Sequence, residues 1–269
     1  MEKIEDKLET EIINRYLSGE SNQDISSSLN LHRSTIQRVL KRNGIKLHAS
    51  KSKLKCNDGF FNSYTKESCY WAGFILADGY LRKDSPTLHI KLGIKDVEHL
   101  YKLLKCIDCE KDIVKKHETY CYIDICKEKI YNGLNKNFDI TNKKTFIAEI
   151  SKKIPTDLLT HFLRGYFDAD GSVSIKEKKY LTINFIGTKK VINYLMDYFF
   201  DSGVQIRTNK RNTTNKPVIY DVNHNEKIGI IQYNCRNAEK ILNILYQDSA
   251  IDIRLDRKYE IYNQNKAKS

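Results

Sequence analysis

The sequence contains no apolar run that could cross a membrane. Its densest apolar stretch, residues 71–77, is far shorter than the roughly 20 residues of a spanning helix. The N-terminus, Met-Glu-Lys-Ile-Glu-Asp, is charged and has no apolar signal region. We therefore expect no membrane partner, and a cytoplasmic or nucleoid-associated location in a bacterial or phage-infected cell, or an organellar one.

The seven cysteines do not form the pattern of a disulfide framework. Their number is odd in a long chain, which favours a reducing compartment. Cys106 and Cys109 form the chain's one Cys-x-x-Cys pair, and no second pair completes a zinc site. Cys121 and Cys126 lie five positions apart on a predicted strand, so they point to opposite faces. We interpret these cysteines as small core residues.

Acidic residues are absent from residues 25–57, although the whole chain has 34 of them against 46 Lys plus Arg. The net charge of +12 favours polyanionic partners such as nucleic acid or anionic membrane, but it says nothing about the fold. The acid-free segment carries eight cations: Arg33, Arg38, Lys41, Arg42, Lys46, Lys51, Lys53 and Lys55. A segment with charge of one sign is either a solvated arm or a phosphate-binding surface.

Residues 1–50 have the pattern of three short helices. Apolar spacing predicts helices over residues 8–18, after Ser21, and over about residues 34–43, where Gly44 is a C-terminal cap. This pattern predicts a helix-turn-helix domain and resembles the helix-turn-helix regions of bacterial and phage DNA-binding proteins. Its third helix presents the candidate DNA-binding residues Arg33, Gln37, Arg38, Lys41 and Arg42.

The alternative for this segment is a small helical bundle that caps the protein or binds another protein. The outward side of the third helix carries no acid, which favours groove binding. The polar, basic residues 51–64 have no clean periodicity and are interpreted as a linker.

The rest of the chain contains an internal repeat. Residues 71–79, Trp-Ala-Gly-Phe-Ile-Leu-Ala-Asp-Gly, align without a gap with residues 163–171, Leu-Arg-Gly-Tyr-Phe-Asp-Ala-Asp-Gly, at an offset of 92. An alternating strand and an amphipathic helix follow each copy. We therefore divide the region into a first half, residues 65–150, and a second half, residues 151–269.

Each repeated helix has a stripe of small residues along one face. Gly73 and Ala77 lie four positions apart on one face, as do Gly165 and Ala169. Gly in a helix interior costs about 1 kcal/mol relative to Ala, and close packing of the two stripes would compensate. Gly79 and Gly171 are expected to supply left-handed caps at the helix ends.

Asp78 and Asp170 stand at the C-terminal ends of these helices, where the helix macrodipole disfavours a negative charge. If the helices pack side by side, the two carboxylates also repel each other. A divalent cation between them would reverse both effects, with the last helical carbonyls, those of Ala77 and Ala169, as extra ligands. Oxygen ligands with open water positions suit Mg²⁺ or Mn²⁺. The alternative is that each Asp only ends its helix and bonds a nearby turn.

With these paired motifs the chain resembles the LAGLIDADG homing endonucleases of the single-chain, two-motif type, over roughly residues 65–265. The resemblance implies an α+β fold, a pseudo-twofold tandem αββαββα whose two sheets form a saddle over the DNA major groove. It also implies that Asp78 and Asp170 hold the catalytic metals, that each half cuts one strand, and that short 3′ overhangs result.

The resemblance also implies a basic residue of each half near the scissile phosphates. We assign Lys143 before the second motif and Lys258 near the C-terminus. Glycines 93 and 187 lie near the positions where some relatives have a polar side chain that organises water. The motifs themselves depart from the family pattern at Trp71, Leu76, Arg164, Tyr166 and Phe167, none of them a metal position.

Base recognition is expected from the polar faces of the strands. The candidates are Arg82, His89, Lys91, Lys116, Lys176, Thr182, Asn184, Arg207, Asn209 and Arg211.

The sequence thus predicts a monomeric, metal-dependent, site-specific double-strand DNA endonuclease, encoded by a mobile intron, a free-standing gene or a phage insertion. The alternatives are a non-cutting transcriptional regulator, which would be expected to lose one or both aspartates, and an RNA maturase, against which the helix-turn-helix argues.

Overall fold

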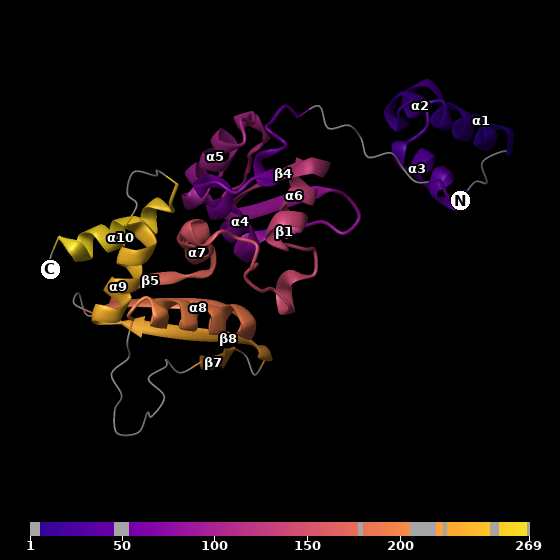
Figure 1. Cartoon of the computed structure of the whole chain (residues 1–269). Helices are drawn as coiled ribbons and strands as arrows, with labels where there is room; N and C mark the ends of the chain where they lie inside the picture. Colours follow the sequence, from indigo (N-terminus) through magenta and orange to yellow (C-terminus); the bar gives the residue numbers. More distant parts are fainter. Residues whose placement is uncertain are drawn as a thin grey trace. The chain divides into compact units, whose positions relative to one another are not determined.

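A computed structural model describes residues 6–45, 54–176, 180–204, 219–222, 225–247 and 253–267. The chain divides into two compact units, residues 1–53 and residues 54–269 (Figure 1). Each unit has its own apolar core, and the two cores share no residue.

The first unit consists of the helices α1 (Asp6–Leu17), α2 (Asn22–Ser28) and α3 (Arg33–Arg42). Ser21 caps α2, because its side chain accepts a 3.2 Å hydrogen bond from the Asp24 backbone N–H. Gly19 and Gly44 have φ values of +98° and +70°, so they end their helices in the conformation that favours glycine. The core of the unit is formed by Ile12, Tyr16, Ile25, Ile36, Val39 and Leu40.

The second unit repeats one arrangement twice. The first half contains α4 (Lys66–Asp78), β1 (Gly79–Leu81), β2 (Thr87–Gly93), α5 (Val97–Cys106), β3 (Lys115–Lys116), β4 (Tyr120–Cys126) and α6 (Glu128–Phe138). The second half contains α7 (Leu159–Asp170), β5 (Ser172–Lys176), β6 (Tyr180–Thr188), α8 (Lys189–Asp201), β7 (Ile219–Val222), β8 (Asn225–Asn234) and α9 (Cys235–Tyr246). A further helix, α10 (Asp256–Lys266), follows α9. Short 3₁₀ turns in the described residues are η1 (Phe60–Asn62), η2 (Ile94–Asp96), η3 (Lys111–Ile113), η4 (Lys144–Phe146) and η5 (Thr156–Leu158).

The sheets of the two halves have the same topology. Both are antiparallel, with the orders β1-β2-β4-β3 and β5-β6-β8-β7. The predicted α+β class and tandem αββαββα order are therefore confirmed. The outer strand of the first-half sheet is short, because η3 occupies Lys111–Ile113 and only Lys115–Lys116 pair with β4.

Helices α4 and α7 pack against each other at the centre of the second unit (Figure 1). A Cβ atom on Gly73 would lie 1.9 Å from the carbonyl oxygen of Phe162, and one on Gly165 would lie 1.9 Å from that of Tyr70. No side chain fits at either place, so the predicted close approach of the glycine stripes is confirmed.

The prediction of left-handed caps at Gly79 and Gly171 is wrong. Their φ values are −75° and −78°, and both backbones are extended. Each helix instead enters its strand directly, and the chain doubles back over the last helical turn. A Cβ on Gly79 would lie 2.7 Å from Ile75 Cγ2, and one on Gly171 would lie 2.3 Å from Phe167 Cδ2. Glycine is required there for space and not for a positive φ.

Residues 54–64, which the sequence assigns to the linker, pack on the second unit. Phe61 is buried in its core and lies against Gly133 of α6, while Leu54, Cys56, Phe60 and Tyr64 are partly buried there. The aromatic side chains at the end of this polar stretch account for its docking. Within the described ranges, no helix has the length and apolar character that a membrane crossing requires.

Candidate active site

Asp78 and Asp170 are the last residues of α4 and α7, so the packing of these helices places the two carboxylates at the same end of the helix pair. Asp78 is exposed and Asp170 is half-buried. Desolvation, followed by the negative charge of Asp78, raises the pKa of Asp170 to about 6. Desolvation also raises the pKa of Asp78. The predicted convergence of the two acids is thus present in the structure.

Within the part of the chain that the structure describes, neither carboxylate takes part in the hydrogen bonds that hold the fold. Among the described residues, no backbone or side-chain group donates a hydrogen bond to Asp78 or Asp170. The alternative in which each aspartate bonds a nearby turn therefore has no support in this part of the chain. Two free carboxylates with a mutual repulsion are an arrangement that a divalent cation would stabilise.

A lysine ammonium group lies against the C-terminal end of α4. Lys144 Nζ donates hydrogen bonds to the carbonyl oxygens of Ile75, Leu76 and Ala77 at 2.8, 2.5 and 2.7 Å. The sequence assigned this place to Lys143, but the Lys143 side chain is exposed. Lys144 is the residue that η4 turns toward α4, and no local pattern distinguishes the two adjacent lysines.

Lys258 occupies the matching place in the second half, as predicted. Its Nζ donates to the carbonyl oxygens of Phe167, Asp168 and Ala169 at 2.7, 2.7 and 3.3 Å, and also to that of Gly171. The side chain is 1% exposed. Lys144 follows α6 and Lys258 lies on α10, and each neutralises the negative end of a motif helix.

Burial lowers the pKa of both lysines to about 8. For Lys144 the opposing effect comes first from Asp170 and then from Asp78, and for Lys258 it comes first from Asp168. The two acids and two bases therefore form one electrostatically coupled group at the helix ends.

The predicted metal ligands are only partly free. The carbonyl oxygens of Ala77 and Ala169 already accept hydrogen bonds from Lys144 and Lys258. An ammonium group at these oxygens disfavours a second cation there, so the carboxylates are the better ligands. No group of three or more His, Cys, Asp or Glu side chains that could hold a metal was found among the described residues. The two carboxylates alone suit a hard cation that keeps several waters or takes ligands from a phosphate.

The residues near the helix ends also explain one departure from the family motif. Tyr166 donates a 2.7 Å hydrogen bond to the carbonyl oxygen of Ile186, and a Cβ on Gly187 would lie 2.1 Å from the Tyr166 hydroxyl. Glycine at 187 leaves room for this tyrosine. At Gly93, in contrast, no atom lies within 4 Å of such a Cβ, so that position is open.

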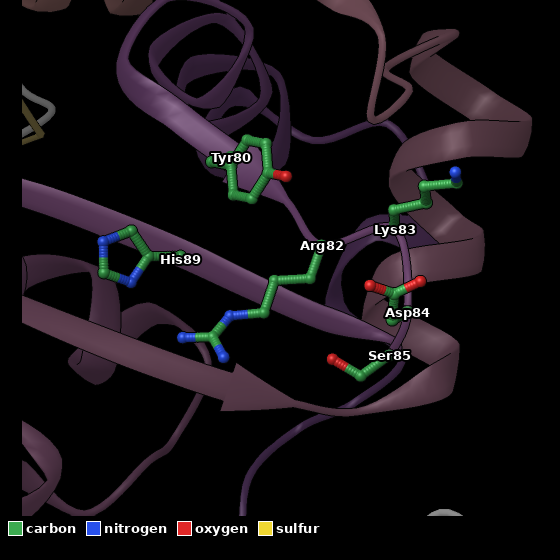
Figure 2. Close-up of a pocket in the computed structure, with 6 residues that line it drawn as sticks. All are labelled: Tyr80, Arg82, Lys83, Asp84, Ser85 and His89. Atoms are coloured by element: carbon green, nitrogen blue, oxygen red, sulfur yellow. The ribbon is translucent and has the colours of Figure 1, made fainter. Parts of the chain in front are cut away.

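The open face of the first-half sheet carries three of the predicted DNA-binding residues. Arg82 Nη2 and His89 Nδ1 lie 2.8 and 3.0 Å from the same Asp124 oxygen. Lys91 lies over the ring of Tyr120, 3.8 Å from its centroid. A pocket of about 540 Å³ is lined by Tyr80, Arg82, Lys83, Asp84, Ser85 and His89. Figure 2 shows how these six side chains lie.

The strand register separates Lys116 from this face. Lys116 pairs with the buried Cys121 and lies over the ring of Tyr101 on α5, on the side that the helices cover. Its neighbour Lys115 pairs with Tyr122 and lies over the Tyr122 ring, 5.3 Å from the centroid. Lys115 is thus the lysine that β3 places on the open face.

Aromatic residues that the sequence analysis did not select also line this face. The rings of His117 and Tyr120 stack with centroids 4.3 Å apart, and Tyr120 and Tyr122 stack at 6.4 Å. The alternation of Tyr120 and Tyr122 with the buried Cys121 and Ile123 was the signal that could have identified them.

The open face of the second-half sheet carries amides and hydroxyls beside β5, of which Thr182 is buried. Farther along β6 and β8 the same face carries the half-buried Ile186 and Ile230. Asn184 donates a 3.0 Å hydrogen bond to Ser172, and Thr182 donates a 3.1 Å bond to Asn234. Gln232, which also donates to Asn234, was not among the predicted residues. Lys176 ends β5, while Arg207, Asn209 and Arg211 lie outside the described residues.

The candidate groove-binding residues of α3 differ in their surroundings. Arg33, Arg38 and Lys41 are exposed, and Gln37 is half-buried. Arg42 is also exposed, but it forms an ion pair with Glu9 of α1. Arg42 is therefore partly neutralised within its own unit.

Comparison with known proteins supports the class of fold that this geometry defines. Residues 157–246 match the family model described as "LAGLIDADG-like domain". The resemblance predicted from the paired motifs is thus confirmed by a family match in the second half. No curated protein matches the sequence.

Solved structures with a similar arrangement include three described as LAGLIDADG or meganuclease complexes with DNA. The homing endonuclease I-GzeII, in complex with its DNA target, is 15% identical, with a TM-score of 0.45 over 75% of this chain and 89% of that chain. The meganuclease I-SmaMI, bound to uncleaveable DNA, is 12% identical, with a TM-score of 0.49 over 75% and 88%. The homing endonuclease I-LtrWI, bound to target DNA, is 12% identical, with a TM-score of 0.43 over 79% and 92%.

Proposed function

We propose that this protein is a site-specific endonuclease that hydrolyses both strands of duplex DNA with a divalent metal, Mg²⁺ or Mn²⁺. The observation that carries the proposal is the pair of carboxylates of Asp78 and Asp170, at the ends of two closely packed helices, to which no described residue donates a hydrogen bond. A fold that needed only stability would not retain two unpaired acids at the negative ends of both helices. The family match over residues 157–246 supports the same activity.

In this proposal the two aspartates bind the metal, and the two lysines act on the phosphates. A bound divalent ion would activate water and stabilise the leaving oxygen. The Lys144 and Lys258 ammonium groups neutralise the helix ends and add positive charge where the negative charge of a scissile phosphate increases. Because one chain supplies both carboxylates and both lysines, a monomer contains the whole site.

Duplex DNA is the proposed partner of the two open sheet faces. The first-half face offers Arg82, His89, Lys91 and Lys115, and the second-half face offers the amides of Asn184, Gln232 and Asn234. Arginine and lysine recognise guanine in the major groove, and amides recognise adenine. The α3 residues Arg33, Gln37, Arg38 and Lys41 are proposed to extend the contacts as a helix-turn-helix. Lys176, Arg207, Asn209 and Arg211 remain proposed DNA contacts, and intron homing or another mobile element is the proposed biological context.

The second candidate function is a transcriptional regulator that binds DNA through the same faces without cutting it. The retention of both aspartates in matching positions favours the endonuclease. RNA maturation is a third candidate, against which the proposed groove-binding surface of α3 argues.

The test uses the full chain and a supercoiled plasmid that carries the uninterrupted insertion locus of its own gene. With Mg²⁺ we expect a linear product with short 3′ overhangs, and with EDTA no cutting. Supercoiled plasmid that persists with Mg²⁺ and Mn²⁺, together with a tight footprint, would favour the regulator.

A further inference from the structure

We propose that Asp168 is a positioning residue that fixes helix α10, and through it the Lys258 ammonium group, at the active site. This inference rests on the proposed endonuclease function for its catalytic consequence. Its structural part concerns only contacts within the second unit.

Asp168 is a fully enclosed carboxylate with three hydrogen-bond donors. It is 1% exposed and accepts from the hydroxyls of Tyr70 at 2.7 Å and Tyr246 at 2.6 Å, and from the backbone N–H of Leu255 at 2.8 Å. These donors come from α4, from α9 and from the residue that caps α10. A buried carboxylate costs several kcal/mol of desolvation, which these donors offset.

The Leu255 bond determines where α10 begins. Leu255 is the N-cap residue of the helix, and Lys258 lies on its first turn. The lysine whose Nζ reaches the end of α7 is three positions after the residue with the anchored N–H. A helix is stiff over this length, so a shift at Leu255 moves the ammonium group by a similar amount.

The first half of the unit holds the same segment from the other side. Lys102 of α5 donates to the carbonyl oxygen of Arg254 at 2.9 Å and to Asp256 at 2.7 Å. Arg257 donates to Asp96 at 2.9 Å. In each of these ion pairs one of the two side chains is more than half exposed, so each pair contributes little to stability. The buried Asp168 is therefore the principal anchor of the segment.

The two halves differ at this point. In the repeat alignment, Asp168 corresponds to Leu76, a buried apolar residue of α4. Lys144 therefore donates to the α4 carbonyls, and α4 has a leucine instead of an acid at the position that matches Asp168. The geometry makes the second-half lysine dependent on Asp168, while the first-half lysine is independent of it.

Two variants of Leu255 isolate the hydrogen bond. Leu255→Pro removes the N–H, and the φ of −79° at this position is compatible with proline. Leu255→Ala is the matched control, because it removes the buried leucine side chain but keeps the N–H. Asp168→Asn, which keeps the shape of the side chain, is the complementary change at the acceptor.

Cleavage of a duplex labelled on each strand is the first measurement. Leu255→Pro and Asp168→Asn are expected to slow one strand about 10–100-fold more than the other, so that nicked DNA accumulates. Leu255→Ala should keep the wild-type ratio of the two rates. A loss of stability alone lowers the fraction of folded protein and slows both strands equally, so equal slowing would overturn the proposal.

Hydrogen exchange of the free protein gives a readout that does not depend on cutting. We expect faster exchange over α10 in Leu255→Pro than in Leu255→Ala. If α10 exchanges at the same rate in the two variants, Asp168 does not fix the helix. This conclusion does not depend on whether the protein cuts DNA. If the wild type cuts no DNA but α10 loses protection as expected, the proposed function fails while the structural anchor stands.

Discussion

Gly73 lies so close to Phe162 that an added Cβ atom would stand 1.9 Å from the Phe162 carbonyl oxygen. The contact is between two helix backbones, which cannot yield as a flexible side chain could. It places the ends of α4 and α7 together and brings Asp78 and Asp170 to one site.

Gly73→Ala should therefore destabilise the protein. In an ordinary helix interior the same change stabilises the helix by about 1 kcal/mol. We expect a loss of about 3 kcal/mol or more in the free energy of unfolding, from overpacking at the helix interface. Gly93→Ala is the control, because a Cβ there meets nothing within 4 Å. Urea unfolding of the two variants tests this, and equal stabilities would contradict the close approach.

Lys144→Ala should reduce the DNA cleavage rate on the order of 10²-fold, as the loss of a group that stabilises developing charge does in other enzymes. The matched control is Lys143→Ala, since the Lys143 side chain is exposed and does not reach α4. Single-turnover cleavage at saturating protein compares them. A larger effect at Lys143 would restore the assignment made from the sequence.

Stability should fall as pH rises through the range in which Asp170 ionises. Its pKa is raised to about 6 in the folded protein by desolvation and by Asp78. An unfolded aspartate has a pKa of about 3.9, so the folded state binds the extra proton between these values and loses stability as pH increases through them.

Asp170→Asn removes this ionisation. It should raise the free energy of unfolding at pH 7.5 by on the order of 1 kcal/mol, allowing for partial solvent screening, and change it little at pH 3.5. Urea unfolding in EDTA measures the difference, with the exposed Asp84→Asn as control. A gain of the same size at both pH values would rule out the ionisation as its cause.

Arg38→Ala should weaken DNA binding and reduce the salt dependence of the affinity by about one phosphate contact. Arg42→Ala should have a smaller effect, because the Arg42 guanidinium is already paired with Glu9. The affinity of each variant for DNA is measured from about 50 to 200 mM salt, and the slopes of log affinity against log salt concentration are compared. If neither slope changes, α3 does not lie on DNA.

The repeat, the two glycine stripes and the aspartate pair could be predicted because they depend on spacings that can be read directly from the sequence. Gly73 and Ala77 are four apart in any helix, and the offset of 92 relates the two copies. The predicted strand that holds Cys121 and Cys126 is present as β4 (Tyr120–Cys126).

What could not be predicted depends on contacts between distant segments. Lys144 rather than Lys143 reaches α4 because η4, a single 3₁₀ turn, sets the direction of each side chain. Lys115 rather than Lys116 faces outward because β3 pairs with β4 in one register. Asp168 looks like a third motif acid in the sequence, and only the folded positions of Tyr70, Tyr246 and Leu255 identify its hydrogen-bond partners.

The most direct test of the central claim is strand-resolved cleavage of the target duplex with Mg²⁺ by the wild type, Asp78→Asn and Asp170→Asn. We predict that the wild type cuts both strands and that each variant binds the DNA but makes no double-strand break. Double-strand cutting by either variant at the wild-type rate would contradict it.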